Sequence, residues 1–284
     1  MTVFNGRLYA STGRGNAAQI WRSLDGTNWA RVVNAGFGDP DIVDITVLAE
    51  YNGLIYAGAT HSVTGAQIWR SYTGDSNSWT LVAPAVAGTT ASTITGFAVF
   101  DGALYTAVSL DDGSPGQIWN SFGGAWTTIV SDGFGNSDTT MTGGMAAFGG
   151  YLYVGAGNTA DGAQLWRTND GSIWEQMISP GFGDTNNQKI ELVYVFQNQL
   201  FVSVKNSVTG IEIWRSTNGT TWEQANQDGF DDSKNTSTNW RNATTDFWGQ
   251  LYVGTSNTTD GGELWQKHPD FNQKVYLPVI LRNP

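Results

Sequence analysis

Short segments rich in apolar and β-branched residues alternate along the whole chain with turns rich in Gly, Asn and Asp. One such segment covers residues 93–100 and is followed directly by Asp101-Gly102. An Asp-Gly or Asn-Gly pair between two strand-like segments predicts a two-residue hairpin turn, because both positions tolerate positive φ. The pattern therefore predicts antiparallel strands joined by tight turns, and it predicts no helix.

This pattern occurs six times, and each copy carries a Tyr or Phe in its second expected strand and a Trp in its third. The period, 47 to 51 residues, is typical of propeller blades of four strands. The sequence predicts an all-β, six-bladed β-propeller of four-stranded antiparallel blades. The marker residues are Tyr9, Tyr56, Tyr105, Tyr153, Phe201 and Tyr252, and Trp21, Trp69, Trp119, Trp166, Trp214 and Trp265.

The repeats run from end to end, so we expect one body over residues 1–269. Its repeat units cover roughly 1–40, 41–90, 91–138, 139–186, 187–236 and 237–269. The sixth unit has no further Trp after Trp265, so its outer strand must be built differently. Residues 270–284 contain a strand-like run with Pro278, and proline is tolerated on an edge strand. We expect this segment to form the edge strand that closes the last blade, with a tether as the alternative.

Composition and charge remove several classes of function. The chain has 25 acidic and 14 basic residues and a net charge of −11, which disfavours nucleic acid and anionic membrane surfaces as partners. It has no cysteine, which excludes disulfides, thiolate metal sites and cysteine nucleophiles. No apolar run approaches the roughly 18 residues of a membrane helix. The first residues read as a strand already under way, so we expect an exported protein, extracellular or at the cell surface, whose leader is absent here.

The turn between the third and fourth expected strands carries a family resemblance. It reads Ser-Leu-Asp-Gly-Thr-Asn-Trp at 23–29, Thr-Asn-Asp-Gly-Ser-Ile-Trp at 168–174 and Ser-Thr-Asn-Gly-Thr-Thr-Trp at 216–222. These segments resemble the Asp-box, or BNR, repeat of sialidase-like propellers, with one residue fewer between Asp and Gly. Copies at 71–79 and 121–126 depart further, and the sixth unit has none. The resemblance implies the propeller fold more than any activity.

The tight hairpins are expected on one face of the disc, and the longer loops and the links between units on the other, the long-loop face. Binding residues favour elaborate loops, so we place any site there or at the central opening. A Gly-Phe element recurs in four of the links. It offers aromatic platforms for glycan pockets with Asp or Asn to accept sugar hydroxyls, or carboxylates for Ca²⁺. The alternative, which we favour, is a buried Phe between adjacent blades. The residues are Phe37, Phe134, Phe182 and Phe230, with Asp39, Asp184 and Asp231 as metal candidates.

Residues that break the repeat are more informative about function than residues that follow it. Trp240, Arg241 and Asn242 precede the innermost strand of the sixth unit, and Asp246 lies within it. Together they could line a sugar-binding mouth, or they could plug the joint beside the irregular first blade. Lys189 and Glu191 are similar exceptions in the fifth unit, and we expect them to form a salt bridge.

Catalysis finds little support in the sequence. The arginines that follow the third-strand Trp occupy one repeated position, so they are spread around the ring and are expected to pair locally. The Gln or Glu two residues before that Trp is expected to hydrogen-bond at the strand end. His61 and His268 are far apart in the repeat scheme, and neither a metal cluster nor a Ser-His-Asp arrangement is visible. The arginines are Arg22, Arg70, Arg167 and Arg215.

We therefore expect a non-enzymatic exported binding or scaffold module, with a glycan or protein ligand on the long-loop face. No cofactor is expected other than Ca²⁺ at the carboxylates of the links. One alternative is a glycoside hydrolase or lyase of the sialidase-like propeller type, which requires three arginines and an acidic pair at the channel mouth. The other is a structural subunit of a cell-surface assembly, suggested by the edge-strand tail.

Overall fold

The computed structural model describes residues 1–13, 18–83, 92–110, 113–158, 160–178, 180–238, 244–247, 249–267 and 271–275. Over these residues the chain is strand and turn, with three short 3-10 segments: η1 (Gly36–Gly38), η2 (Gly181–Gly183) and η3 (Asp228–Asp231). No helix in the described ranges is long and apolar enough to cross a membrane. The expectation of an all-β fold is confirmed.

The strands follow one another in the order that the repeats predict. The first copy contains β1 (Thr2–Phe4), β2 (Arg7–Thr12), β3 (Gln19–Ser23) and β4 (Trp29–Val33), and the second β5 (Ile42–Tyr51), β6 (Leu54–His61), β7 (Gly65–Ser71) and β8 (Trp79–Ala83). The third contains β9 (Ser92–Phe100), β10 (Ala103–Leu110), β11 (Gln117–Ser121) and β12 (Thr127–Val130), and the fourth β13 (Thr139–Phe148), β14 (Tyr151–Asn158), β15 (Gly162–Thr168) and β16 (Glu175–Ile178). The fifth contains β17 (Asn187–Phe196), β18 (Gln199–Asn206), β19 (Glu212–Ser216) and β20 (Glu223–Gln224), and the last β21 (Thr244–Phe247), β22 (Gln250–Gly254), β23 (Leu264–Lys267) and β24 (Phe271–Val275).

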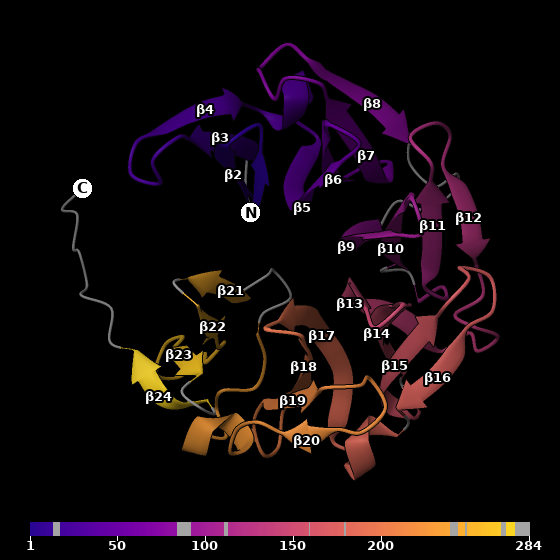
Figure 1. The fold of residues 1–284 in the computed structure, drawn as a ribbon, viewed down its shortest axis with the longest axis vertical. Helices are drawn as coiled ribbons and strands as arrows, with labels where there is room; N and C mark the ends of the chain where they lie inside the picture. Colours follow the sequence, from indigo (N-terminus) through magenta and orange to yellow (C-terminus); the bar gives the residue numbers. More distant parts are fainter. Residues whose placement is uncertain are drawn as a thin grey trace.

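Every strand pair is antiparallel, and the sheets stand around a central opening (Figure 1). Four sheets have four strands each, in the orders β1 to β4, β5 to β8, β9 to β12 and β21 to β24. A fifth, eight-stranded sheet combines β13 to β16 with β17 to β20, and the residue pair Gly157 and Lys189 joins its two halves. The described architecture is propeller-like, and β24 is the outer strand of the last sheet.

In the second to sixth copies the first strand lies toward the centre of the ring, and in the first copy, where β1 is short, the end of β2 does so. A central cavity of about 670 Å³ is lined by residues of β2, β5, β9, β13, β17 and β21. Each copy therefore presents one strand to the same space, and the outer strands lie far from it (Figure 1).

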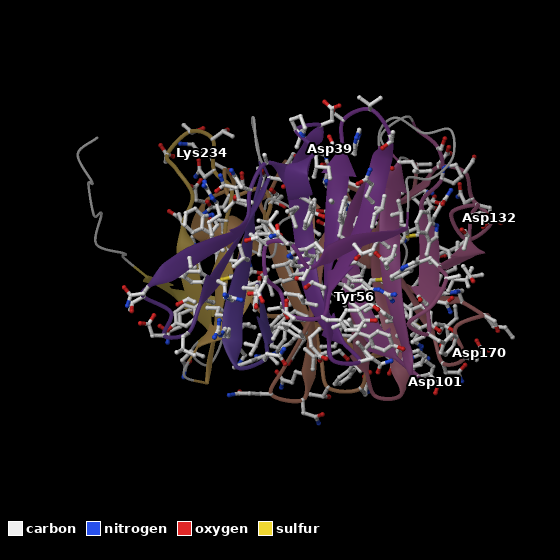
Figure 2. The ribbon with its side chains drawn as sticks, turned by 90° about the horizontal axis from the view of Figure 1, so that it is seen from above. Asp39, Tyr56, Asp101, Asp132, Asp170 and Lys234 are labelled. Carbon is white, nitrogen blue, oxygen red and sulfur yellow. The ribbon has the colours of Figure 1, made fainter. Side chains whose placement is uncertain are left out.

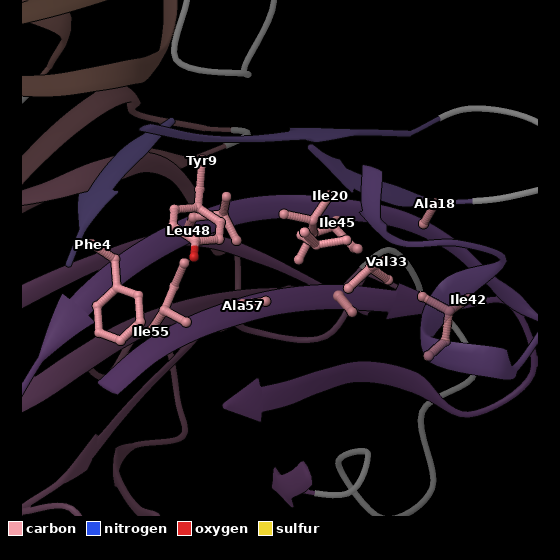
Figure 3. Close-up of a cluster of buried hydrophobic side chains, with 12 residues drawn as sticks. Phe4, Tyr9, Ala18, Ile20, Val33, Ile42, Ile45, Leu48, Ile55 and Ala57 are labelled. Carbon is pink, nitrogen blue, oxygen red and sulfur yellow. The ribbon is translucent and has the colours of Figure 1, made fainter. Parts of the chain in front are cut away.

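Neighbouring sheets pack against each other through apolar side chains. Between the first two sheets, Phe4, Tyr9 and Ile20 meet Ile45 and Ile55 in one buried cluster (Figure 3). All five side chains are at most 2% exposed. Burying each of them contributes roughly 1.5 to 3 kcal/mol, so this contact between sheets is a principal source of stability.

The repeated Tyr of the second strand reaches into the next copy. The Tyr9 hydroxyl donates to the Thr73 carbonyl at 3.5 Å, beside Gly74 in the turn between β7 and β8. A Cβ added to that glycine would lie closer than 3.0 Å to the tyrosine ring and hydroxyl. Real Cβ atoms essentially never make contacts that short. Glycine is thus required for two reasons: the backbone has a positive φ, and a larger residue would clash with the tyrosine. The same crowding relates Tyr9 to Gly74, Tyr105 to Gly171 and Tyr153 to Gly219.

The corresponding turn of the first copy is open. Gly26 is exposed, and an added Cβ would meet nothing within 4 Å, although its φ of +76° equals that of Gly219. The Tyr of the last copy, Tyr252, is half-buried, whereas Tyr9 and Tyr153 are 1% exposed. The joint between the last and first copies therefore differs from the others, as the irregular ends of the sequence predict.

Gly219→Ala should lower the free energy of unfolding by about 1 to 3 kcal/mol more than Gly26→Ala does. Both substitutions cost the same backbone strain because their φ values are equal, but only Gly219 faces a tyrosine hydroxyl. Urea unfolding of the two variants and the unmodified chain measures the difference. Equal losses would contradict the inter-copy contact.

Candidate functional site

The two faces of the disc are distinct. Seen edge-on, Asp39 and Lys234 of the links lie at one face, and Asp101 and Asp170 of the tight turns lie at the other (Figure 2). The links and the loops between second and third strands share the first face, because the Gly36 amide donates to the Ala18 carbonyl at 2.9 Å. This is the long-loop face on which the sequence places a site.

The four link phenylalanines adopt one geometry. Each has a positive φ, from 57° to 62°, and its ring stacks on the third-strand Trp of the copy that follows. Ring centroids are 4.3 to 4.5 Å apart and the planes diverge by 8° to 14°. One face of each ring is therefore covered by an indole, as a packing role requires. The pairs are Phe37 with Trp69, Phe134 with Trp166, Phe182 with Trp214, and Phe230 with Trp265.

The same tryptophans are fixed by a hydrogen bond within their own strand. In every copy the indole Nε1 donates to the side-chain oxygen two residues earlier, over 2.7 to 3.0 Å. Glu212 and Glu263 each accept a second bond, from Asn187 and Asn235 respectively, both at 2.8 Å. The expected strand-end hydrogen bonds are present. The acceptors are Gln19, Gln67, Gln117, Gln164, Glu212 and Glu263.

The carboxylates of the links hold their own loops. Asp184 Oδ1 accepts the Asn186 amide at 2.8 Å, and its Oδ2 accepts from Asn206 Nδ2 at 3.0 Å. Asp39 Oδ1 likewise accepts an amide two residues later, at 3.0 Å. In the last link the residue with these bonds is Asp232, whereas Asp231 is exposed and has a φ of 66°. Such Asx turns use the oxygens that a cation would need.

His61 takes part in the same arrangement, although the sequence offers no role for it. Its Nδ1 accepts the amides of Val63 and Thr64, both at 3.1 Å, and its Nε2 lies 3.2 Å from Asp39 Oδ2. Amides can only donate and a neutral imidazole has one N–H, so Nε2 carries the proton and donates to Asp39. Asp41 completes a group of three potential ligands within 4.8 Å. Neither imidazole nitrogen has a lone pair left for a metal ion.

Asparagine makes the same bonds at this position in other copies. Asn206 Oδ1 accepts the amides of Val208 and Thr209 at 2.9 and 3.0 Å, while its Nδ2 donates to Asp184. Asn257 does the same with Asp232. His61 thus makes with its imidazole the hydrogen bonds that Asn206 and Asn257 make with their side-chain amides. Aligning the copies on their Gly-Phe links would have revealed it, because His61 and Asn206 both end the second strand of their copy.

His61→Asn should leave the free energy of unfolding within about 0.5 kcal/mol of the unmodified chain, whereas His61→Ala should lower it by about 1 to 3 kcal/mol. The amide reproduces the imidazole bonds, whereas alanine removes the partner of the Val63 and Thr64 amides and of Asp39. Thermal and urea unfolding check both variants. A Ca²⁺-dependent rise in unfolding temperature that Asp39→Asn abolishes would instead identify a metal site.

The residues that break the repeat in the last copy are only partly described. Trp240, Arg241 and Asn242 lie outside the described residues. Asp246 lies in β21, where its backbone pairs with Leu251, and its side chain is outside the described part. Thr244 of the same strand lines the central cavity. The strand that follows Trp240 therefore belongs to the cavity wall.

The central cavity has few titratable groups. Its described lining includes Asp44 and Tyr194 but no Arg, Lys or His. Hydroxyls of Ser11 and Thr12 and the apolar side chain of Phe97 are also part of the wall. The cavity reaches the long-loop ends of the strands, where Thr12 closes β2.

The repeated arginines lie on the third strands, away from this wall, and they pair locally. Arg22 Nη1 bonds Asp75 Oδ1 at 2.7 Å, and Arg70 Nη1 donates to the Gly123 carbonyl at 2.7 Å. Arg167 pairs with Glu175 and lies 4.1 Å from the Tyr151 ring centroid, and Arg215 pairs with Glu223 at 2.7 Å. The expected local pairing is confirmed.

Polar side chains join the innermost strands around the cavity. The Thr46 hydroxyl donates to the Ile94 carbonyl at 2.7 Å, and the Thr95 hydroxyl donates to the Gly143 carbonyl at 3.2 Å. Each bond crosses from one copy to the next. In the fifth copy Glu191 holds this position, and its Oε2 accepts the Thr238 amide at 2.9 Å.

Glu191 and Lys189 form the ion pair that the sequence suggests, with Lys189 Nζ 3.5 Å from Glu191 Oε1. Burial raises the pKa of the Glu191 carboxyl. Burial also lowers the pKa of Lys189 to about 8, helped by Lys205, while Glu191 opposes the shift. Lys205 lies directly opposite Lys189 in the ladder of β17 and β18. Two cations and one carboxylate therefore share a poorly solvated site.

Lys189 should make stability increase with pH between about 8 and 10.5. Its folded pKa lies below its unfolded value, so the unfolded chain binds more protons in this window and loses that advantage as pH rises. Lys189→Met should remove the slope. Unfolding free energies of both proteins, measured at several pH values, test this.

Lys234→Met is the matched control. Lys234 lies on the same face, but it is exposed and pairs with Asp260 at 2.7 Å, which raises its pKa. This variant should therefore retain the rise between pH 8 and 10.5. The same slope in the unmodified chain and in Lys189→Met would contradict the lowered pKa.

Comparisons with known proteins support the fold alone. No protein-family model and no curated protein sequence matches this chain. A chain from the crystal structure of a nidogen/laminin complex matches with a TM-score of 0.59 and 13% identity, over 95% of this chain and 92% of that one. Aleuria aurantia lectin in complex with alpha-methyl-L-fucoside matches with a TM-score of 0.54 and 14% identity, over 92% and 91%.

Trypanosoma rangeli sialidase also matches, with a TM-score of 0.56 and 11% identity. The match covers 97% of this chain but 54% of the sialidase chain, so this protein spans about half of that length. These likenesses establish a propeller-like fold of the kind found in sialidases and lectins. They leave activity to be inferred from the chain's own residues.

Proposed function

We propose that this protein is a six-bladed β-propeller of four-stranded blades, one body over residues 1–269 closed by the C-terminal segment, that acts as a non-enzymatic binding module. Its ligand is a glycan or a protein, held where the central cavity opens on the long-loop face. Two proteins with a similar fold support this proposal. One is a lectin whose structure contains a bound fucoside, and the other is part of a nidogen/laminin complex.

The observation that carries the proposal is that the repeated residues of the long-loop face are used for packing and loop structure, whereas the central cavity is not. The repeated phenylalanines stack on indoles, and the repeated carboxylates accept hydrogen bonds from amides of their own links and from the side chain at the end of a second strand. Neither set is available as a whole for a ligand. The cavity of about 670 Å³, by contrast, offers hydroxyls and an aromatic ring in a concave space.

We assign the residues that break the repeat to this opening. Thr244 lines the cavity, and Trp240, Arg241 and Asn242 precede it by two to four residues. An indole, a guanidinium and an amide are the groups that recognise a sugar ring and its hydroxyls, or a polar loop of a protein. We assign Trp240 as the principal contact and Asp246 as a further candidate.

The lining of the cavity favours binding over hydrolysis. A sialidase-like mechanism needs three arginines and an acidic pair at one point, and the described lining offers Asp44 as its carboxylate. The repeated arginines bond partners on the third and fourth strands and in adjacent turns. Location outside the cell is part of the proposal, since glycans and matrix proteins are found there.

A glycan array followed by calorimetry tests the proposal. Trp240→Ala should weaken binding at least tenfold, and Gly144→Leu should do the same by filling the cavity. Gly144 lines it, and an added Cβ would have only ordinary contacts, 3.6 Å from Val193. Ile173→Ala, an exposed apolar side chain in a tight turn of the opposite face, should have no effect.

The absence of binding to any sugar, together with full activity of Trp240→Ala in every protein-partner assay, would remove the glycan version. Retained binding by both Trp240→Ala and Gly144→Leu would place the site elsewhere. Cleavage of a glycan during the incubation, detected by mass spectrometry, would favour the hydrolase or lyase instead.

A further inference from the structure

The face opposite the long loops carries a row of exposed apolar side chains. Leu24, Tyr72 and Phe122 are 79%, 69% and 70% exposed. All three occupy the same position, directly after the Ser that ends the third strand, in three successive copies. The fourth and fifth copies have Asn169 and Thr217 there. We call Leu24, Tyr72 and Phe122 the apolar turn arc.

The turns that carry the arc are rigid. Ser23 Oγ accepts the Gly26 amide at 2.8 Å, and Ser71 Oγ accepts the Gly74 amide at 2.7 Å. Ser121 Oγ accepts the Gly123 amide at 3.1 Å. The backbone around each apolar side chain is therefore held by hydrogen bonds of its own turn. Binding of a partner would thus cost little conformational entropy in these turns.

Arginines also tie the three turns to one another. Arg22 of the first copy bonds Asp75 in the second copy's turn, and Arg70 of the second bonds the Gly123 carbonyl in the third copy's turn. In the fourth and fifth copies, by contrast, Arg167 and Arg215 pair with glutamates of the adjacent strand in their own sheets. The apolar residues and the cross-ties thus occupy the same part of the ring.

Carboxylates accompany the apolar side chains. Asp25 follows Leu24, and the amides of Asn28 and Thr27 hold its pKa far below the usual range. Asp170 lies in the next turn beyond the arc, and the amides of Ile173 and Ser172 lower its pKa to about 2. Both carboxylates are exposed and are charged at neutral pH.

We propose that the apolar turn arc is a docking surface for a polypeptide segment in which arginine side chains alternate with apolar ones. Apolar side chains of the segment pack on Leu24, Tyr72 and Phe122, and its guanidinium groups meet Asp25 and the aromatic faces. Aromatic and arginine side chains are the groups most enriched at the centre of protein interfaces.

Charge decides the chemistry of the partner. The chain carries a net charge of −11, and Arg22 and Arg70 beside the arc are already bonded. Arg7 is exposed and lies within electrostatic range of Asp75. An acidic partner would be repelled. Arginine is favoured over lysine because a planar guanidinium stacks on Tyr and Phe as well as pairing with a carboxylate. The surface lies on the face opposite the site proposed above, so either can fail without the other.

Fluorescence anisotropy with four labelled 14-residue peptides tests the proposal: alternating Arg-Leu, Lys-Leu, Arg-Ser and Glu-Leu. The Arg-Leu peptide should bind at least tenfold more tightly than the Arg-Ser and Glu-Leu peptides, and more tightly than the Lys-Leu peptide. The variant L24N/Y72N/F122N should lose at least tenfold in affinity for it. Phe122→Asn alone should lose a smaller part and serves if the triple variant does not fold.

V63N/V208N is the matched control, because Val63 and Val208 are 57% and 62% exposed on the long-loop face. It should bind the Arg-Leu peptide as the unmodified chain does. If the Arg-Ser peptide bound as tightly as the Arg-Leu peptide, charge alone would explain the affinity, and the proposal would be overturned. Unchanged binding by both arc variants would do the same. Concentration-dependent dimerisation that L24N/Y72N/F122N abolishes in sedimentation would assign the arc to a second copy of this chain, against the proposal.

Discussion

The contact between neighbouring sheets is the interaction on which the rest of the structure depends. A four-stranded antiparallel sheet of this size leaves two apolar faces, and both must be covered by the adjacent copies. Buried tyrosines such as Tyr9 and Tyr153 do this by extending from one copy into the turn of the next. The Gly-Phe links add a stacked Phe and Trp at the other face of the disc. Together these contacts place the innermost strands around one cavity.

The use of repeated residues for packing between copies explains why these residues indicate little about function here. A side chain at an equivalent position in each copy is carried around the ring and meets its neighbours' framework, as the Phe–Trp pairs and the indole bonds show. Binding chemistry must come from departures from the repeat. Two such departures stand out: the residues that precede β21, a strand whose Thr244 lines the cavity, and the apolar side chains that three turns of one arc share.

Much of the fold could be predicted from sequence because it depends on local signals. Asp101-Gly102 marks a hairpin between β9 and β10, and the alternating Leu-Tyr and Ile-Trp segments become the second and third strands. The site was less predictable because it depends on side-chain hydrogen bonds between distant segments. His61 reads as a loop histidine until its bonds to Asp39 and Val63 are seen. Asp232 takes the position expected for Asp231 because the fourth link replaces the second Gly of the element by Asp.

A double-mutant cycle across one joint tests the central claim most directly. Tyr56 of the second copy and Trp126 of the third meet edge to face with ring centroids 6.4 Å apart. Tyr56→Leu, Trp126→Leu and the double variant should give a coupling free energy of about 1 kcal/mol in urea unfolding. Strict additivity of the two single losses would contradict the claim that aromatic contacts between copies hold this ring together.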